Sequence, residues 1–366
     1  MLWGRAAILL PSAALALALL APAGVRADDQ SHSDQGHQQD GHGDDEGDGW
    51  GDGGHGGHGG HGGGATPTVY PTSLGKVAAS ANGITVFRIA PSGSVAVVSG
   101  NGARMSVSTA RFSVSIYCNS NACARRNTQL EIGSTGTPTG RLGSLDDFTV
   151  AMGSANLVSG PIGNNPIRFT LGPMGRGGTV TFFIGADAPV YGDDFAGKPT
   201  GPASSAIYVA TSSSSGRNTV IAGAALTANV FRRLTVSQLS PLTFGTIVKP
   251  VAGSGSVVLD ASTGAYSISG GAALSSPIPS RGAFGVTGEG GQAISIGVPS
   301  SFAMVNGHGD TISVTTSNTA SGMQMLSNAP GSAGTFTFRV GGSFSFGGAT
   351  PTGAYSGTYM VDVAYN

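Results

Sequence analysis

The chain has 366 residues, of which 62 are glycine and only 10% are charged. Glycine loses much backbone entropy in a helix, and the Lys and Glu residues that usually cover helix surfaces are scarce, so this composition excludes a mainly helical fold. An all-β protein is the class that remains. The formal net charge is −1 and no run of Lys or Arg exceeds two residues, so a nucleic-acid-binding surface is not indicated.

Residues 1–27 are typical of an export signal. Arg5 supplies positive charge, residues 6–20 are apolar, and Val25-Arg26-Ala27 is a small-x-small cleavage site. A retained membrane anchor is the alternative, but Pro11 interrupts the apolar stretch, and no later stretch is long enough to span a bilayer. We therefore expect an exported protein in the periplasm, at the outer surface or outside the cell, with no membrane span in the mature chain.

Residues 28–75 are rich in Gly, His and Asp and contain little that can form a core, so we expect them to be disordered. Six of the seven histidines fall here, and His55, His58 and His61 recur in the rhythm Gly-Gly-His. Imidazoles among carboxylates suit Zn or Ni, and a glycine-rich chain can wrap a cation. The alternative is a hydrophilic spacer, and no other cofactor is indicated.

The first folded domain is expected over residues 76–211, as a sandwich of short strands. Turn signals such as Gly160-Pro161 separate these strands at the spacing of an immunoglobulin-like sandwich. The predicted strands cover residues 84–89, 94–99, 111–118, 148–152, 167–171, 179–184 and 206–210.

Two cysteines, Cys118 and Cys123, follow the most regular of these strands. Phe112, Val114, Ile116 and Cys118 alternate with polar residues and so share one face of the strand. In an exported chain the default for two nearby cysteines is a disulfide, here across a short turn. A metal pair is less favoured because no His or further Cys lies nearby in the sequence.

Residues 212–224 are rich in Ser and Gly and are expected to link the first domain to a second sandwich over residues 225–366. Predicted strands of the second domain cover residues 228–236, 241–247, 256–260, 266–271, 283–288, 293–299 and 335–346. Short segments match between the halves in the same order. Residues 111–114 match 282–286, 168–170 match 335–337, and 177–182 match 341–346. This pattern indicates a tandem repeat, with chance matching in a Gly/Ser-rich chain as the alternative.

The last fourteen residues predict a terminal strand that closes a sheet. The residues expected on its apolar side, or at its start, are Gly353, Tyr355, Tyr359, Val361, Val363 and Tyr365. Polar residues such as Ser356 and Asp362 fall on the other side, as in a half-buried strand. Because chain ends fray unless a sheet holds them, we expect this strand to complete a sandwich or to pair with a partner.

The second half resembles an uncharacterised family of proteobacterial exported domains, domain of unknown function 4402. The matching segments are Leu242-Thr243-Phe244-Gly245, residues 256–259 with 269–271, residues 284–288, residues 340–344 and residues 355–366. The resemblance covers the whole second domain, and the first domain looks like a more distant relative. It implies a pilin-like, surface-associated β-sandwich with no assigned activity.

The C-terminus is also similar to that of chaperone-usher pilus subunits. Those subunits carry a Gly fourteen residues from the end and a penultimate aromatic residue, which Gly353 and Tyr365 match. The similarity implies that a periplasmic chaperone or a neighbouring subunit pairs with the final strand. It departs at the N-terminus, where residues 28–64 are not the alternating apolar segment that a donor strand requires. A tip subunit, a monomeric surface protein or a self-complemented sandwich therefore remains open.

No constellation of catalytic residues is recognised. The only histidine beyond the tail is His308, in a turn sequence, and no Gly-x-Ser-x-Gly elbow lies between a strand and a helix. We therefore predict a non-enzymatic structural or adhesive surface protein that acts by strand pairing. The alternative is an extracellular glycan- or protein-binding module whose His-rich tail captures metal.

Overall fold

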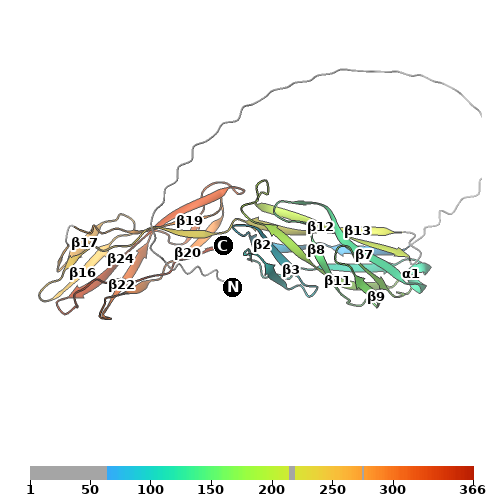
Figure 1. The fold of residues 1–366 in the computed structure, drawn as a ribbon, viewed down its shortest axis with the longest axis horizontal. Coiled ribbons are helices and arrows are strands. Elements are labelled where there is room, and N and C mark those ends of the chain that lie inside the picture. Colours follow the sequence, from blue (N-terminus) through green and yellow to red (C-terminus); the bar gives the residue numbers. More distant parts are fainter. Residues whose placement is uncertain (1–63, 214–218, 274–275) are drawn as a thin grey trace, which may run out of the picture. The chain divides into compact units, whose positions relative to one another are not determined.

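The computed structural model describes residues 64–213, 219–273 and 276–366 (Figure 1). This part of the chain is almost entirely β-structure, as the composition predicts, and its strands form two sandwiches. The expected export signal and the three histidines of the Gly-Gly-His rhythm lie outside the described residues. Among the residues that are described, no helix has the length and apolar character needed to cross a bilayer.

The first sandwich extends from residue 65 to residue 231. It consists of β1 (Ala65–Tyr70), β2 (Thr72–Ala78), β3 (Ile84–Ile89), β4 (Val95–Ser99), β5 (Ala103–Arg104), β6 (Phe112–Cys118), α1 (Asn121–Arg125), β7 (Thr128–Thr139), β8 (Asp146–Ala151), β9 (Leu157–Ile162), β10 (Ile167–Leu171), β11 (Thr179–Tyr191), β12 (Gly201–Ser213) and β13 (Val220–Phe231). One sheet has the order β1-β6-β11-β3-β4, with β8 also on β11. The other has the order β5-β2-β13-β12-β7-β10-β9.

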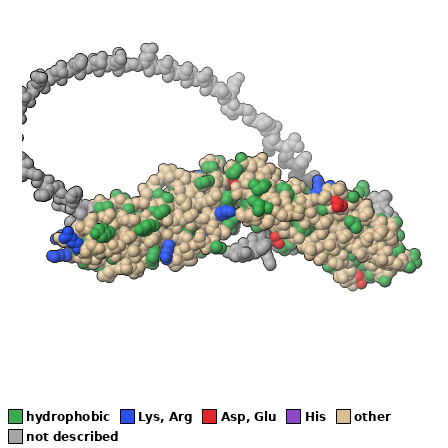
Figure 2. All heavy atoms as spheres, turned by 180° about the vertical axis from the view of Figure 1, so that it is seen from behind, with side chains coloured by type: hydrophobic (Ala, Val, Ile, Leu, Met, Phe, Trp, Pro, Cys, Tyr) green, Lys and Arg blue, Asp and Glu red, His purple; other side chains and the backbone are tan. Residues whose placement is uncertain are grey.

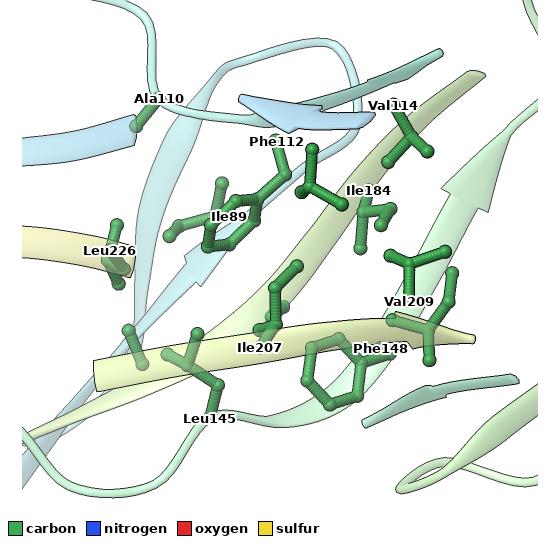
Figure 3. Packing of buried hydrophobic residues seen from close by; sticks show 14 of the residues in the cluster. Ile89, Ala110, Phe112, Val114, Leu145, Phe148, Ile184, Ile207, Val209 and Leu226 are labelled. Carbon is green, nitrogen blue, oxygen red and sulfur yellow. The ribbon is translucent and has the colours of Figure 1, made fainter. Parts of the chain in front are cut away.

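The core of the first sandwich lies between these two sheets (Figure 3). Both sheets contribute apolar side chains to this core, because every second residue of a strand points to the same face of its sheet. Phe112, Val114 and Ile184 come from one sheet, and Ile207 and Val209 come from the other. All five are fully buried. On the face shown in Figure 2, charged side chains are sparse and hydrophobic ones are scattered.

The first sandwich begins earlier than the sequence predicts. Residues up to 75 were expected to be disordered, but β1 pairs with β6 along its whole length, and β2 pairs parallel to β13. Ala65, Pro67 and Val69 are buried at every second position of β1. Small residues and a proline carry a weak strand signal, which is why composition alone placed this segment with the tail.

The first sandwich also ends later than expected. Within the predicted linker over 212–224, residues 212–213 and 220–224 lie instead in β12 and β13, which pair from Gly201 opposite Val230 to Thr211 opposite Val220. The predicted domain start at residue 225 is therefore wrong, because it lies inside β13. The two sandwiches are joined by residues 232–234.

The second sandwich consists of β14 (Thr235–Ser240), β15 (Ile247–Val248), β16 (Ser254–Leu259), β17 (Tyr266–Ser269), β18 (Ala272–Ala273), β19 (Gly282–Glu289), β20 (Ala293–Gly297), β21 (Ser301–Val305), β22 (Thr311–Asn318), β23 (Met323–Met325), β24 (Ala333–Gly347) and β25 (Asp362–Tyr365). Its large sheet has the order β14-β19-β24-β16-β17, with β22 on β24 and β21 on β22. The facing sheet has three strands in the order β23-β20-β25, and β15 pairs with β18.

Candidate functional site

The C-terminal strand of the second sandwich is paired on one side only. β25 runs antiparallel to β20, with Val363 opposite Ile296 and Tyr365 opposite Ile294. Figure 1 shows the C-terminal end of the chain beside β20. No described strand pairs with the other side of β25. We call the side of β25 that faces away from β20 the open edge.

The open edge presents backbone groups that another strand can bond. The N–H of Asn366 donates to the carbonyl oxygen of Ala293 at 3.1 Å, which sets the hydrogen-bonding pattern of the ladder. In an antiparallel pair, residues that bond the partner strand alternate with residues whose N–H and C=O point away from it. Ala364 shares the bonding side with Asn366. Val363 and Tyr365 therefore direct their backbone N–H and C=O groups to the open edge.

The first sandwich shows what the open edge lacks. Six strand pairs of the first sandwich each have a counterpart in the second. In the first sheet, β1–β6 corresponds to β14–β19, β6–β11 to β19–β24, β3–β11 to β16–β24 and β3–β4 to β16–β17. In the facing sheet, β7–β10 corresponds to β20–β23 and β7–β12 to β20–β25. This match agrees with the expected tandem repeat. β25 takes the place of β12, yet β12 is paired on both sides, by β7 and by β13. The described part of the second sandwich has no counterpart of β13.

The missing strand leaves the core of the second sandwich partly uncovered. On β12, Ile207 and Val209 are fully buried at 0% exposure. At the equivalent end of the second sandwich, Val361, Val363 and Tyr365 are only half-buried, although they pack on the cluster around Phe338. The side chains point to the core as the alternation predicts. Among the described strands, none lies beside β25 on the open edge to cover them.

Residues 234–365 match the family model described as a domain of unknown function, DUF4402. The second sandwich is therefore similar to this family, and we call it the DUF4402 domain after that match. The matched range begins one residue before β14, which agrees with the structural start of this sandwich.

The chain matches no curated protein. Among solved structures it is similar to a chain from a study of the chaperone–tip adhesin complex in CFA/I fimbriae biogenesis. That chain is 12% identical, and the match covers 81% of the present chain and 96% of the other, with a TM-score of 0.22.

Two tyrosines fix the end of the DUF4402 domain. The hydroxyl of Tyr365 accepts a hydrogen bond from the N–H of Glu289 at 2.6 Å and donates one to the carbonyl of Arg232 at 2.9 Å. The ring of Tyr359 lies 5.0 Å from that of Phe302, and its buried hydroxyl has no partner among the described residues. Burial raises the pKa of Tyr359 to about 12. Burial is also the main reason that the pKa of Tyr365 rises to about 12.

The predicted assembly strand is shorter than the sequence indicates. Of the last fourteen residues, only 362–365 form a strand, so Val363 and Tyr365 lie in β25, whereas Gly353, Tyr355, Tyr359 and Val361 precede it. Tyr355 donates to the carbonyl of Pro351 at 2.9 Å. Alternation continues through the preceding coil, where Tyr355, Tyr359 and Val361 are half-buried. The backbone pairing of this segment is thus shorter than the sequence predicts.

The other residues singled out in the sequence lie away from β25 or outside the described chain. A disulfide joins Cys118, at the end of β6, to Cys123 in α1. His55, His58 and His61 are not among the described residues, so their binding of Zn or Ni stays a prediction. His308 lies in the turn between β21 and β22, where its N–H donates to the side chain of Asn306 at 3.0 Å. The described residues include no group of three or more metal-ligating side chains.

Sequence reasoning missed the partners of β25. The alternation of Ile294 and Ile296 identifies a strand, but nothing in it shows that this strand pairs with the chain end rather than with its neighbour in sequence. The topology of the first sandwich holds the missing information, because β7 and β12 pair in the same way. A strand-by-strand alignment of the two sandwiches makes β25 the equivalent of β12, and therefore the partner of β20.

Proposed function

We propose that the open edge of β25 accepts an extended strand from another protein, and that the chain is a non-enzymatic structural or adhesive component of an exported surface assembly. The observation that carries this proposal is the pairing difference between β12 and β25 in two sandwiches of matching topology. An unprotected edge with half-exposed apolar side chains is a liability in a soluble protein, and pairing with a strand removes it.

The first sandwich indicates what the incoming strand must look like. β13 runs antiparallel to β12, and it buries Leu226, Ala228 and Val230 at every second position. A strand that completes the DUF4402 domain should therefore carry small or branched apolar residues with the same period. Its backbone would bond the outward N–H and C=O groups of Val363 and Tyr365.

A second copy of the chain is a poor source of this strand. The first two strands of the folded part, β1 and β2, are already paired within their own sandwich, with β6 and with β13. The segment before them, residues 28–64, is rich in Gly, His and Asp and lacks alternating apolar residues. On this proposal the chain accepts a strand, while neither the sequence of residues 28–64 nor the strands of the described first sandwich offer one to donate, so we infer a terminal position in the assembly. The partner is then a periplasmic chaperone before assembly, and a different subunit afterwards.

A self-completed variant tests the proposal. Residues 214–231, which comprise the hairpin connection and β13, are appended after Asn366, so that a copy of β13 can fold back onto β25. The matched control carries the same extension with Leu226 and Val230 of the copy changed to Ser. We expect the unmodified extension to raise the thermal unfolding midpoint by several degrees over the control. Equal midpoints for the two extensions would show that no strand site exists at this edge.

A further inference from the structure

The outer face of the larger sheet in the first sandwich carries a polar hollow that strand pairing does not use. Its volume is about 470 Å³, and strands β7, β9, β10 and β12 form its floor and rim. The residues that line it include Gln129, Glu131, Arg168, Thr170, Ala210 and Ser212. These positions alternate with buried ones such as Leu130 and Phe169, so their side chains point away from the core.

Two side chains that line the hollow, Glu131 and Arg168, and their neighbour Tyr208 are held in fixed positions across adjacent strands. Arg168 on β10 donates its Nε to one carboxylate oxygen of Glu131 on β7, and Tyr208 on β12 donates its hydroxyl to the other, each at 2.7 Å. The Tyr208 ring lies over Gly133, where a Cβ would come within 2.8 Å of a ring carbon. Glycine at position 133 therefore lets the aromatic ring lie close to the sheet, with part of its surface in solvent.

The remaining hydrogen-bonding groups in the hollow are free to meet a ligand. Both carboxylate oxygens of Glu131 are occupied, whereas the two terminal nitrogens of Arg168 have no partner among the described residues. The side chains of Gln129, Thr170 and Ser212 also make no hydrogen bond within the described chain. Donors and acceptors are both present, and the one positive charge is balanced by the one carboxylate.

We propose that this hollow binds a neutral oligosaccharide. A balanced pair of charges gives no advantage to an anionic or cationic ligand, whereas sugar hydroxyls can donate to and accept from amide, hydroxyl and guanidinium groups. Beside the hollow, the half-buried ring of Tyr208, whose hydroxyl is bonded to the lining residue Glu131, offers an apolar surface to the C–H face of a sugar. The exposed side chain of Ile162 adds a second apolar contact at the rim. The hollow would thus make the first sandwich the ligand-binding domain, independently of strand acceptance by the second.

The test uses the full mature chain on a printed array of neutral oligosaccharides of glucose, galactose, mannose and their N-acetylated forms, followed by titration calorimetry with each bound sugar. Two variants alter the hollow. Arg168→Ala removes the free donors, and Ala210→Tyr fills the floor while keeping the ion pair. Arg88→Ala is the matched control, because Arg88 forms a similar exposed ion pair with Asp187 on the other sheet.

We expect wild type to bind at least one neutral oligosaccharide, and each hollow variant to bind it about tenfold more weakly or worse, which corresponds to one lost hydrogen bond of ordinary strength. Arg88→Ala should bind like wild type, and added salt should change the affinity little because the ligand is uncharged. The absence of any bound neutral sugar overturns the proposal. So does binding that survives both hollow variants, or binding restricted to acidic glycans or peptides and lost with salt.

Discussion

Val363 lies directly opposite Ile296 in the β20–β25 ladder, at a position where its backbone N–H points away from β20. Its neighbour Ala364 lies opposite Ser295 and points its N–H toward β20. Two adjacent residues thus serve different edges of one strand. This arrangement allows the pairing inside the domain to be separated from pairing with a partner.

Proline at these two positions should have opposite consequences, because proline has no N–H to donate. Ala364→Pro removes a hydrogen bond to β20 and should lower the free energy of unfolding by about 2 kcal/mol. Val363→Pro leaves the internal ladder intact and should cost less than about 1 kcal/mol. In the chain that carries the appended copy of β13, Val363→Pro should abolish the gain in thermal midpoint. A larger loss of stability for Val363→Pro than for Ala364→Pro would show that the open edge is misassigned.

Local sequence signals predict many of the strands and their buried faces, but they do not predict where each domain begins and ends. Phe112, Val114 and Ile116 alternate with polar residues, so both the strand and its buried face are predicted. The match of residues 111–114 to 282–286 relates β6 to β19, which are equivalent strands. The match of 168–170 to 335–337 relates β10 to β24, which are not equivalent. Short Gly- and Phe-containing segments recur in any such sandwich, so their similarity cannot fix the alignment.

The sequence predicts the inward-facing side chains of the candidate site but not its open edge, and the reason is physical. Apolar alternation can be read from the order of residues in a single strand, so it shows that the side chains of Val361 and Val363 point to the core. An open edge depends on which strands are absent beside β25, and that is a property of the whole sheet. The same reason explains the misplaced linker. Ser and Gly suit a hairpin connection as well as a domain boundary, and only the pairing of Thr211 with Val220 tells them apart.

Tyr359→Phe should be neutral or slightly stabilising at neutral pH, by less than about 1 kcal/mol, because the buried hydroxyl that it removes has no partner among the described residues. In the wild type, the folded pKa of Tyr359, about 12, lies above the ordinary value of 10.0. Its contribution to stability is therefore complete below pH 10 and is lost as the pH rises through 12. Tyr359→Phe should reduce this alkaline loss. Unfolding by denaturant across this pH range measures it, and identical pH profiles for variant and wild type would contradict the assignment.

Tyr365→Phe should behave differently from Tyr359→Phe, since the Tyr365 hydroxyl is bonded to both Glu289 and Arg232. Removal of the hydroxyl leaves the N–H of Glu289 without this partner and should cost about 2 kcal/mol. The comparison of the two Phe variants at pH 7 controls for the general effect of losing a tyrosine hydroxyl. If both variants had the same stability, the hydrogen bonds of Tyr365 would not contribute to holding the chain end.

Loss of the Cys118–Cys123 disulfide should weaken the first sandwich without affecting strand acceptance by the second. The bond closes a short loop at the end of β6, where chain-entropy arguments give a stabilisation of about 2 kcal/mol. The double variant Cys118→Ala, Cys123→Ala should therefore unfold at lower denaturant concentration, and a reducing agent should shift wild type in the same direction but leave the double variant unchanged. The thermal gain from the appended β13 copy should persist in the double variant, because β25 and β20 lie in the other sandwich. If that gain disappeared with the disulfide, the two sandwiches would not fold as independently as their separate cores indicate.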